Sequence, residues 1–422
     1  MVPKGWKIVT LKDLLDGQIK NGYSPNATDS ETGYWVLSLG ALADEGINSS
    51  GIKPVLPEEK VLQNLLKKDD FLVSRSNTPD KVGRSIRFKN EIENCTYPDL
   101  MMRFRIDDTK ADKEFIEQQL KSSTVRAYFK NCAAGSSSTM VKINKGILEK
   151  TPIVVPPIKE QKKIAQILST WDNAISVTEK LLTNSQQQKK ALMQQLLTGK
   201  KRLLDENGVR FSGDWGKFTL SHFGKCIRGV SYKPENICEN ESDNTIRLLR
   251  STNIQNGELN DKDLIILPKK LVKPMQVLMD GDLAICMANG SKSLVGKSAP
   301  YKPNDADYTV GAFCALFRPL KSVSSSFVKF LFESNQYQSQ LLVILAGSSI
   351  NNLKGSDIES INIDAPLHYK EQQKIAAVLS AADAEISTLE KKLACLRDEK
   401  KALMQQLLTG KRRVKVDEAV AV

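Results

Sequence analysis

The sequence has little of what enzyme active sites and metal centres are built from. Only two histidines occur, His222 and His368, and neither belongs to an H-E-x-x-H motif or to a cluster with cysteines. Each is expected to be an ordinary surface or core residue. The sequence also lacks a G-x-S-x-G motif and the Asn/Asp-Pro-Pro-aromatic signature of an amino-methyltransferase. We therefore predict no catalytic residue, no metal site and no cofactor in this chain.

Paired cysteines and long apolar segments are also missing. The seven cysteines are scattered and never form a C-x-x-C pair, which favours reduced thiols over a disulfide framework or a zinc site. The N-terminus lacks the apolar region of a signal peptide. The longest apolar run, Leu341–Ala346, is far too short to cross a bilayer. We expect a soluble, cytoplasmic protein with no membrane partner.

One glycine-rich stretch is similar to a phosphate-binding P-loop but does not match it. Five residues separate Gly290 from Gly296, whereas the P-loop motif has four. Pro300 and Pro303 follow at the point where a helix should begin and direct its N-terminus at phosphate. We interpret this stretch as a flexible loop that contacts a nucleic-acid backbone.

The charge balance favours a polyanionic partner. Lysine and arginine number 61 against 49 aspartates and glutamates, for a net charge of +12 and a pI near 9.2. No basic amphipathic anchor is evident, so nucleic acid is a better candidate than a membrane. At 422 residues the chain is too long for one compact core and predicts two or three domains.

The sequence contains one long element twice. Residues 189–200 and 400–411 both read KKALMQQLLTGK, at an offset of 211. At the same offset, residues 160–182 and 371–393 agree at 13 of 23 positions without a gap. This period is far too long for a solenoid repeat, so the chain carries a duplicated element.

Apolar residues recur within both copies at alternating steps of four and three, which is typical of a coiled-coil seam. An amphipathic helix packed on a globular core is the alternative for a single copy. Two matched copies, each about 60 Å long at 1.5 Å per residue, favour pairing with each other. The predicted interface residues are Ile164, Leu168, Trp171, Ile175, Leu182, Leu192, Leu196, Ile375, Leu379, Ile386, Leu389, Leu393, Leu396, Leu403 and Leu407.

The segments before the two helices repeat more faintly. Trp6 has a counterpart in Trp215, the segment Asp70–Val73 in Asp282–Ile285, and Phe104 in Phe317, with the offset drifting to 213. Short apolar runs between polar loops predict strands, and one or two helices are expected, the clearest around Phe115–Tyr128. Each half is therefore a variable globular module followed by a near-constant helix.

These features predict a mixed α/β (α+β) fold with a pseudo-twofold internal repeat. Two globular domains would be separated by a pair of long antiparallel coiled-coil helices, because antiparallel pairing lets the second helix return to the first module. The predicted boundaries are 1–157 (module), 158–199 (helix), 200–214 (connector), 215–368 (module), 369–410 (helix) and 411–422 (basic tail).

Twofold protein symmetry on DNA corresponds to two half-sites in opposite orientation. Because the modules differ, the half-sites would differ too. We assign DNA contact to loop residues that differ between the modules, since arginine, lysine and asparagine suit base edges and serine suits phosphate. The candidates are Lys20, Asn21, Tyr23, Arg75, Asn77, Lys81, Arg84, Ser136, Ser137, Arg228, Tyr232, Arg250, Asn253, Asn289, Lys292, Lys297, Asn351 and Asn352.

The whole chain resembles the specificity subunits of type I restriction–modification systems. The resemblance rests on Glu160-Gln161-x-Lys163-Ile164-Ala165 and its copy from Glu371, on the doubled LMQQLLTGK, and on Asn253-Ile254-x-x-Gly257 followed by Gly281-Asp282-Leu283. The first module departs from this pattern, because Leu42 stands where the second module has Asn253.

This resemblance implies two target-recognition domains, each of which reads half of a split site in double-stranded DNA. The helices would set the half-site spacing and bind two modification (methyltransferase) subunits that carry S-adenosylmethionine. Two restriction subunits that use ATP and Mg would complete the complex, and this chain itself would not be an enzyme. The alternative is a non-catalytic coiled-coil scaffold with two protein-binding modules.

Overall fold

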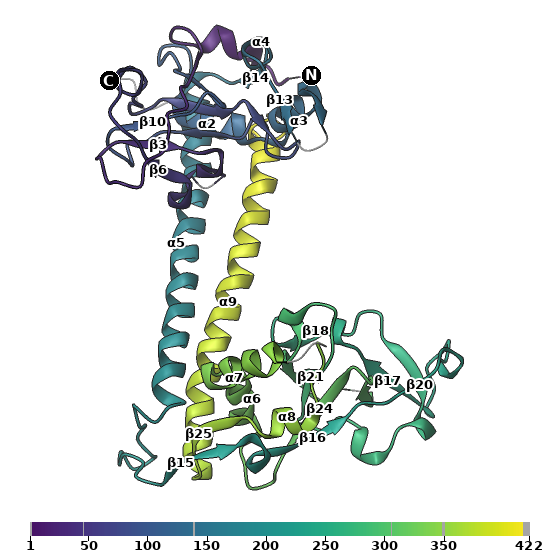
Figure 1. The fold of residues 1–422 in the computed structure, drawn as a ribbon. Coiled ribbons are helices and arrows are strands. Elements are labelled where there is room, and N and C mark those ends of the chain that lie inside the picture. Colours follow the sequence, from purple (N-terminus) through teal and green to yellow (C-terminus); the bar gives the residue numbers. More distant parts are fainter. Residues whose placement is uncertain (1, 45, 138–139, 305, 348–350, 417–422) are drawn as a thin grey trace. The chain divides into compact units, whose positions relative to one another are not determined.

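The structure is a computed structural model that describes residues 2–44, 46–137, 140–304, 306–347 and 351–416. The chain forms two compact units, one made of residues 1–181 with 389–422 and the other of residues 182–388. Each unit combines a globular module with parts of both long helices, α5 (Ile158–Leu196) and α9 (Tyr369–Leu407) (Figure 1). Within those described ranges, no helix is both long and apolar enough to cross a membrane.

The first module contains short strands and four short helices. The strands are β1 (Lys7–Thr10), β2 (Lys20–Asn21), β3 (Trp35–Leu37), β4 (Leu42–Ala43), β5 (Gly46–Ile47), β6 (Ile52–Pro54), β7 (Phe71–Ser74), β8 (Ser76–Asn77), β9 (Ser85–Arg87), β10 (Cys95–Thr96), β11 (Met101–Phe104), β12 (Ala134–Ser137), β13 (Met140–Lys142) and β14 (Pro152–Val155). The helices are α1 (Glu59–Gln63), α2 (Lys113–Lys121), α3 (Ser123–Cys132) and α4 (Lys145–Glu149).

The second module has a similar set of elements. Its strands are β15 (Trp215–Thr219), β16 (Gly224–Arg228), β17 (Thr245–Leu249), β18 (Ile254–Gln255), β19 (Glu258–Leu259), β20 (Ile265–Pro268), β21 (Leu283–Cys286), β22 (Ser298–Pro300), β23 (Tyr308–Val310), β24 (Cys314–Pro319) and β25 (Asn362–Pro366). Its helices are α6 (Ser325–Glu333), α7 (Asn335–Ala346) and α8 (Gly355–Glu359).

The two modules share one topology. The four-stranded sheet β2-β11-β7-β9 of the first module corresponds to β16-β24-β21-β22 of the second, strand for strand. The three-stranded sheet β10-β3-β6 corresponds to β23-β17-β20, with one parallel and one antiparallel pairing in each. The pair β1-β14 corresponds to β15-β25. The predicted internal repeat and the mixed α/β class are thus confirmed.

The helix predicted around Phe115–Tyr128 is two helices in the structure. The backbone of Ser122 is extended (φ −63°, ψ 149°), and its hydroxyl accepts a hydrogen bond from the Val125 backbone N–H. Ser122 therefore ends α2 and caps α3. The sequence does carry a sign of this break, because the polar run 121–124 places Leu120 and Val125 five positions apart instead of three or four.

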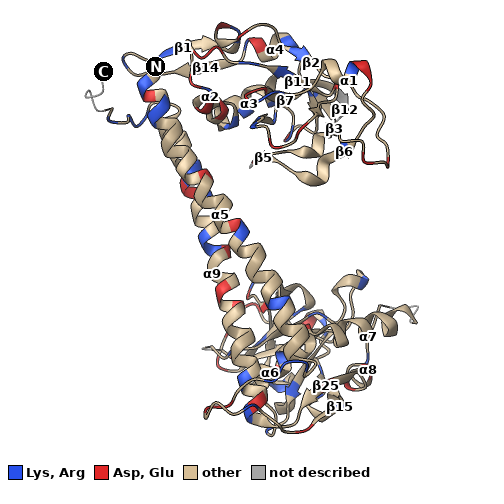
Figure 2. Ribbon diagram, turned by 90° about the vertical axis from the view of Figure 1, so that its left-hand side faces the viewer, with Lys and Arg blue, Asp and Glu red and all other residues tan. Residues whose placement is uncertain are grey.

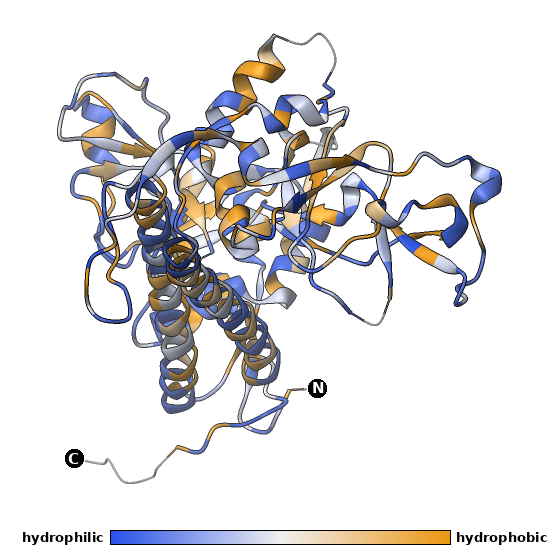
Figure 3. Cartoon of the chain, turned by 90° about the horizontal axis from the view of Figure 1, so that it is seen from below, coloured by the Kyte–Doolittle hydropathy of each residue, from blue (hydrophilic) through white to orange (hydrophobic). Residues whose placement is uncertain are grey.

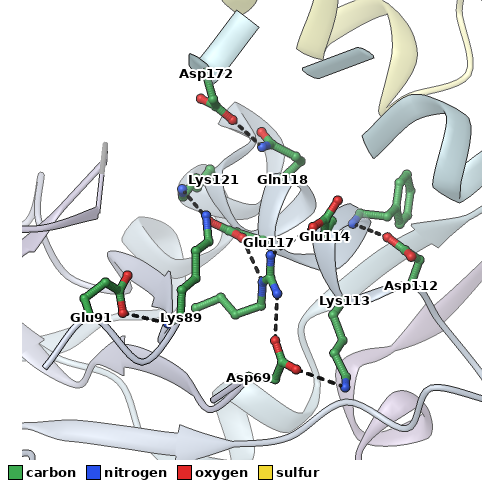
Figure 4. Close-up of polar contacts among 12 residues, drawn as sticks. Asp69, Lys89, Glu91, Asp112, Lys113, Glu114, Glu117, Gln118, Lys121 and Asp172 are labelled. Atoms are coloured by element: carbon green, nitrogen blue, oxygen red, sulfur yellow. Dashed lines mark hydrogen bonds and ion pairs between the residues drawn. The ribbon is translucent and has the colours of Figure 1, made fainter. Parts of the chain in front are cut away.

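Helix α2 has a side-chain cap at its N-terminus and polar contacts with neighbouring segments of the first unit (Figure 4). The Asp112 carboxylate accepts from the Phe115 backbone N–H, and the Gln118 amide donates to Asp172 of α5 at 2.7 Å. Arg87 forms an ion pair with Glu117 at 3.0 Å. Burial alone would raise the pKa of Glu117, but the neighbouring cations, Lys121 foremost, lower it below its ordinary value.

The long helices pair in antiparallel fashion within each unit. In the first unit, Lys400 near the end of α9 meets Asp172 near the start of α5 at 2.5 Å. In the second unit, Lys189 near the end of α5 meets Asp383 near the start of α9, also at 2.5 Å. These two pairs are related by the offset of 211. Figure 2 shows basic and acidic residues along both helices.

The predicted seam residues are buried to differing degrees. Buried members are Ile164, Leu168, Ile175, Leu196, Ile375, Leu379, Leu393 and Leu407, and half-buried members are Trp171, Leu182, Leu192, Ile386, Leu389, Leu396 and Leu403. Ile164, Leu168 and Leu407 share one core cluster with the first module, and Leu196, Ile375 and Leu379 share one with the second. At these positions each seam is also part of a module core.

Two lysines occupy seam positions that an apolar pattern does not identify. Lys189 falls between Ser185 and Leu192 in the alternating four–three spacing, and Lys400 falls likewise between Leu396 and Leu403. Burial by itself would lower the pKa of the Lys189 ammonium, but hydrogen bonds to Asp383 and Glu333 raise it above its ordinary value. A polar pair within a seam fixes the register of two helices.

Each module is locked to the helices by a buried glutamate. Glu371 accepts from Arg202 at 2.5 and 2.7 Å and from the Trp215 indole at 3.4 Å. Glu160 accepts from the Trp6 indole at 3.2 Å and from Arg413. We call these two sets the glutamate clamps. They give a structural reason for the repeated glutamate of the helix motif.

The glutamine that follows each of these glutamates joins the helix to its own module. Gln161 accepts from the Asp112 backbone N–H, and Gln372 accepts in the same way from the Ser324 N–H. Hydrophobic residues concentrate on the module strands, whereas the long helices carry many hydrophilic residues (Figure 3). The globular modules thus supply the core against which the helix ends pack.

The Asp383 carboxylate should stabilise the helix pair in a pH-dependent manner. Burial alone would raise its pKa, but hydrogen bonds from Lys189 and Lys329 lower it below the ordinary value of 3.8. Its contribution is therefore present above about that pH and is lost as the pH falls through the lower folded-state value. We predict that Asp383→Ala lowers the free energy of unfolding by about 1–3 kcal/mol near neutral pH.

Urea unfolding followed by circular dichroism at several pH values measures this difference, which should shrink below pH 3.8. Glu390→Ala removes an exposed carboxylate from the same helix and is the control. Equal destabilisation by both substitutions would show that the ion pair adds nothing to helix pairing.

Candidate nucleic-acid interface

Several of the predicted DNA contacts of the second module meet in one loop cluster. The loop after β21 carries Asn289, whose amide donates to the Ser251 hydroxyl at 3.4 Å. Its backbone N–H donates to the Asn351 carbonyl at 3.3 Å, and the Asn351 amide returns a bond to the Gly290 carbonyl. Asn352 bridges to Ala288 in antiparallel fashion. Three chain segments far apart in sequence are thus joined.

The first module builds the equivalent cluster with a small sheet. Asn77 on β8 is paired with Val141 on β13, and β13 pairs in turn with β12. Arg75 extends this link, because its carbonyl accepts from the Ile143 N–H. Ser136 and Ser137 lie on β12, but their side chains are outside the described residues. The cluster follows β7, the counterpart of β21.

A second group of candidates lies at the end of the neighbouring strands. Lys20 and Asn21 form β2, in which Asn21 pairs with Met102 of β11. Arg228 ends β16 and pairs with Ala315 of β24, the counterpart of β11. Each module therefore presents polar residues from the corresponding edge of its own four-stranded sheet.

The candidates differ in how available their side chains are. Exposed candidates are Lys20, Asn21, Lys81, Arg228, Lys292 and Asn352. Half-buried candidates are Tyr23, Arg75, Asn77, Arg84, Tyr232, Arg250, Asn289, Lys297 and Asn351. The exposed lysines and Arg228 fit an electrostatic contact with phosphates, because these charged side chains can reach DNA without leaving a packed environment.

Some half-buried candidates already have partners within their module. Arg84 donates to the Leu42 carbonyl at 3.2 Å and forms an ion pair with Asp44 at 3.3 Å. Arg250 donates to the Asp263 carbonyl at 2.8 Å, and the Tyr23 hydroxyl donates to Glu58 at 3.3 Å. For these residues the structure supplies a role in holding loops.

Asn253 holds its loop from the inside and does not face solvent. It is 1% exposed, and its amide donates to the backbone carbonyls of Asn260 and Lys262 at 3.1 and 2.7 Å. Its side-chain oxygen accepts from the Arg250 N–H at 2.8 Å. A direct base contact by this side chain would break these bonds, so the structure argues against that prediction. Leu42, which replaces it in the first module, is also buried.

The glycine-rich stretch from Gly290 lacks the geometry of a P-loop. A short 3-10 turn, Lys292–Leu294, is followed by strand β22 instead of a helix. Lys292 is exposed there, whereas Lys297 is half-buried. In the described part of the chain, no group of three or more histidine, cysteine, aspartate or glutamate side chains is arranged to hold a metal ion.

Ser251 is a member of this cluster that the sequence reasoning missed. Ser251 lies in a loop 38 residues before Asn289, and its hydroxyl accepts a hydrogen bond from the Asn289 amide. Only the fold brings the two loops together. Comparison of the two module sequences does not identify Ser251 either, because the first module has Gly40 and Ala41 in the corresponding region.

Known proteins give this arrangement a context. Residues 3–184 and 212–396 each match the family model described as "Type I restriction modification DNA specificity domain". The type I restriction enzyme EcoKI specificity subunit of Escherichia coli K12 is 36% identical over 46% of this chain, and the StySPI specificity subunit of Salmonella potsdam is 32% identical over the same share. These matches cover only 42% and 43% of those relatives, respectively.

Other similarities span the full length. The putative MjaX specificity subunit of Methanocaldococcus jannaschii is 26% identical over 98% of this chain and 95% of its own. The crystal structure of a type I restriction–modification S subunit from M. genitalium aligns with a TM-score of 0.62 at 16% identity, over 96% of both chains. At that identity the structural likeness supports the fold alone.

Asn253 and Asn352 allow a loop-holding role to be separated from a surface role. We predict that Asn253→Ala destabilises the protein by about 1–3 kcal/mol, because buried carbonyls and an N–H group lose their partner. Asn352 is exposed, so Asn352→Ala should leave thermal and urea unfolding unchanged. If Asn253→Ala left unfolding unchanged while it weakened DNA binding, the loop-holding role would be refuted.

Proposed function

This chain belongs to the type I restriction modification DNA specificity family, and we propose that it is the specificity subunit of a type I restriction–modification complex. Each module is a target-recognition domain for one half of an asymmetric bipartite site in double-stranded DNA. The observation that carries this proposal is the repeat itself: one sheet topology used twice, with different polar side chains at the same edge.

Two modification subunits are the proposed protein partners. The exposed residues Lys190, Gln194 and Gln195 of α5 recur as the exposed residues Lys401, Gln405 and Gln406 of α9. Core packing does not require surface residues to be identical, so this repetition supports two contacts with the same kind of partner. We propose that these faces dock the two methyltransferase subunits.

The reaction chemistry would belong to the partners. Modification subunits would supply S-adenosylmethionine, and two restriction subunits would supply the ATP- and Mg-dependent step. This chain would contribute recognition and assembly. Comparison of the methylomes of cells with and without the gene tests the proposal directly. Sequence-specific methylation that persists in full without this chain would refute it.

A phosphate contact predicts a specific salt dependence. Arg228→Ala should weaken binding to all duplexes alike and reduce the slope of log K against log salt by about 1, because one fewer counterion is released. Lys225→Ala is the matched control, since Lys225 is an exposed cation on the opposite face of the same strand, β16. Gel shifts with the full chain at several salt concentrations measure both slopes. Equal slopes for wild type and Arg228→Ala would remove Arg228 from the interface.

The long helices are proposed to set the distance between half-sites. Insertion of one heptad into both helices adds about 10 Å at 1.5 Å per residue, or roughly three base pairs at 3.4 Å each. We predict that the non-specific spacer of the methylated site grows by about this amount while both half-sites keep their sequence. Changed half-site sequences would contradict the separation of spacing from recognition.

A further inference from the structure

An exposed aromatic residue lies in the turn between β23 and β24 of the second module. Phe313 is 72% exposed, although its backbone is firmly held. The Cys314 N–H bonds to the Gly311 carbonyl at 2.8 Å and closes the turn between β23 and β24. The Phe313 carbonyl accepts from the N–H groups of Met287 and Ala288 at 2.8 and 3.1 Å. A rigid turn therefore presents an apolar side chain to solvent.

Single exposed apolar residues are common on protein surfaces, so the position of this one is what matters. Met287 and Ala288 lead directly into Asn289, one of the proposed DNA contacts. On the other side of the turn, the Gly229 N–H bonds to the Cys314 carbonyl at 3.0 Å, immediately after Arg228. Phe313 thus lies between the strand that carries Arg228 and the loop that carries Asn289.

Close backbone approach on the Arg228 side depends on glycine. A Cβ atom on Gly229 would lie 2.2 Å from the Gly311 carbonyl oxygen, which is far inside van der Waals contact. The strand and the Phe313 turn can touch only because this side chain is missing. The ring is therefore held at a fixed place between the two polar segments.

The first module has the same frame with a different side chain. The Leu100 carbonyl accepts from the Arg75 N–H at 2.8 Å, as the Phe313 carbonyl accepts from Met287. Gly22 approaches the turn from the other side, and a Cβ there would lie 2.2 Å from the Tyr97 carbonyl oxygen. Leu100 is 36% exposed. Both modules place an apolar residue at this turn, but not the same one.

We propose that Phe313 is a specificity-determining residue whose ring packs against a base in the half-site of the second module, and that Leu100 takes this place in the first. This inference rests on the proposed function. Arg228 and Lys292 suit phosphates and Asn289 suits a base edge, whereas an exposed ring gains most from an apolar part of a base, such as the thymine methyl group in the major groove. Apolar side chains inserted at base steps are a known mode of DNA contact.

The test uses the full chain with the subunits that co-purify with it, and selection from a random duplex library. Wild type should enrich a bipartite site. Phe313→Ala should bind that site roughly 5- to 150-fold more weakly, the range for loss of recognition at one base pair of a duplex site. It should also relax the preference at a position in one half-site only. Phe313→Leu, which installs the side chain of the first module, should lose less affinity and shift that preference.

Val209→Ala is the control, because Val209 is 62% exposed and lies in the connector between α5 and β15. It should leave affinity and site unchanged. The salt slope should be the same for Phe313→Ala and wild type, since no phosphate contact is removed. A melting temperature equal to that of wild type shows that the variant is folded.

Two results would overturn the inference and leave the proposed function intact: wild-type affinity and site for Phe313→Ala, or loss of preference in both half-sites. Failure of the wild-type complex to enrich any site, with no salt-dependent binding, would instead refute the proposed function. The two failures are therefore distinguishable.

Discussion

The structure depends on the antiparallel pairing of half of one long helix with the opposite half of the other. In each unit the pairing is closed by an aspartate–lysine pair, Asp172 with Lys400 or Asp383 with Lys189, at 2.5 Å. A charged residue in a seam adds less stability than an apolar one, but it strongly disfavours a shifted register. The antiparallel direction decides which end of α9 meets which module, the register fixes which residues face each other, and the glutamate clamps then hold each module in place.

The architecture could be predicted from the sequence because the internal repeat allows one half of the chain to be compared with the other. The heptad spacing and the doubled LMQQLLTGK identified the helices, and apolar runs identified strands such as β7 and β11. Polar seam residues such as Lys189 were missed, because a search for apolar periodicity passes over a lysine whose partner lies 194 residues away. The break at Ser122 was missed although the polar run 121–124 interrupts the three–four apolar spacing there.

The candidate interface was harder to predict than the fold. Residue type alone selected Asn253 and Lys292 equally, yet Asn253 is buried within its loop and Lys292 is exposed. Composition does not distinguish an asparagine that satisfies backbone groups from one that faces solvent. An exposed phenylalanine is overlooked for the opposite reason, since an aromatic residue beside a strand is normally assigned to the core. Only the fold separates these cases.

The first unit has a consequence for how the protein is made. Its clamp joins Glu160 and Trp6 to Arg413, and its helix pair needs residues 389–407, so it needs residues that leave the ribosome after the whole second unit. The second unit is continuous in sequence and has all its parts earlier. The module that is synthesised first therefore belongs to the unit that is completed last. Until residues 389–407 have been synthesised, the part of α5 that they cover has no partner helix.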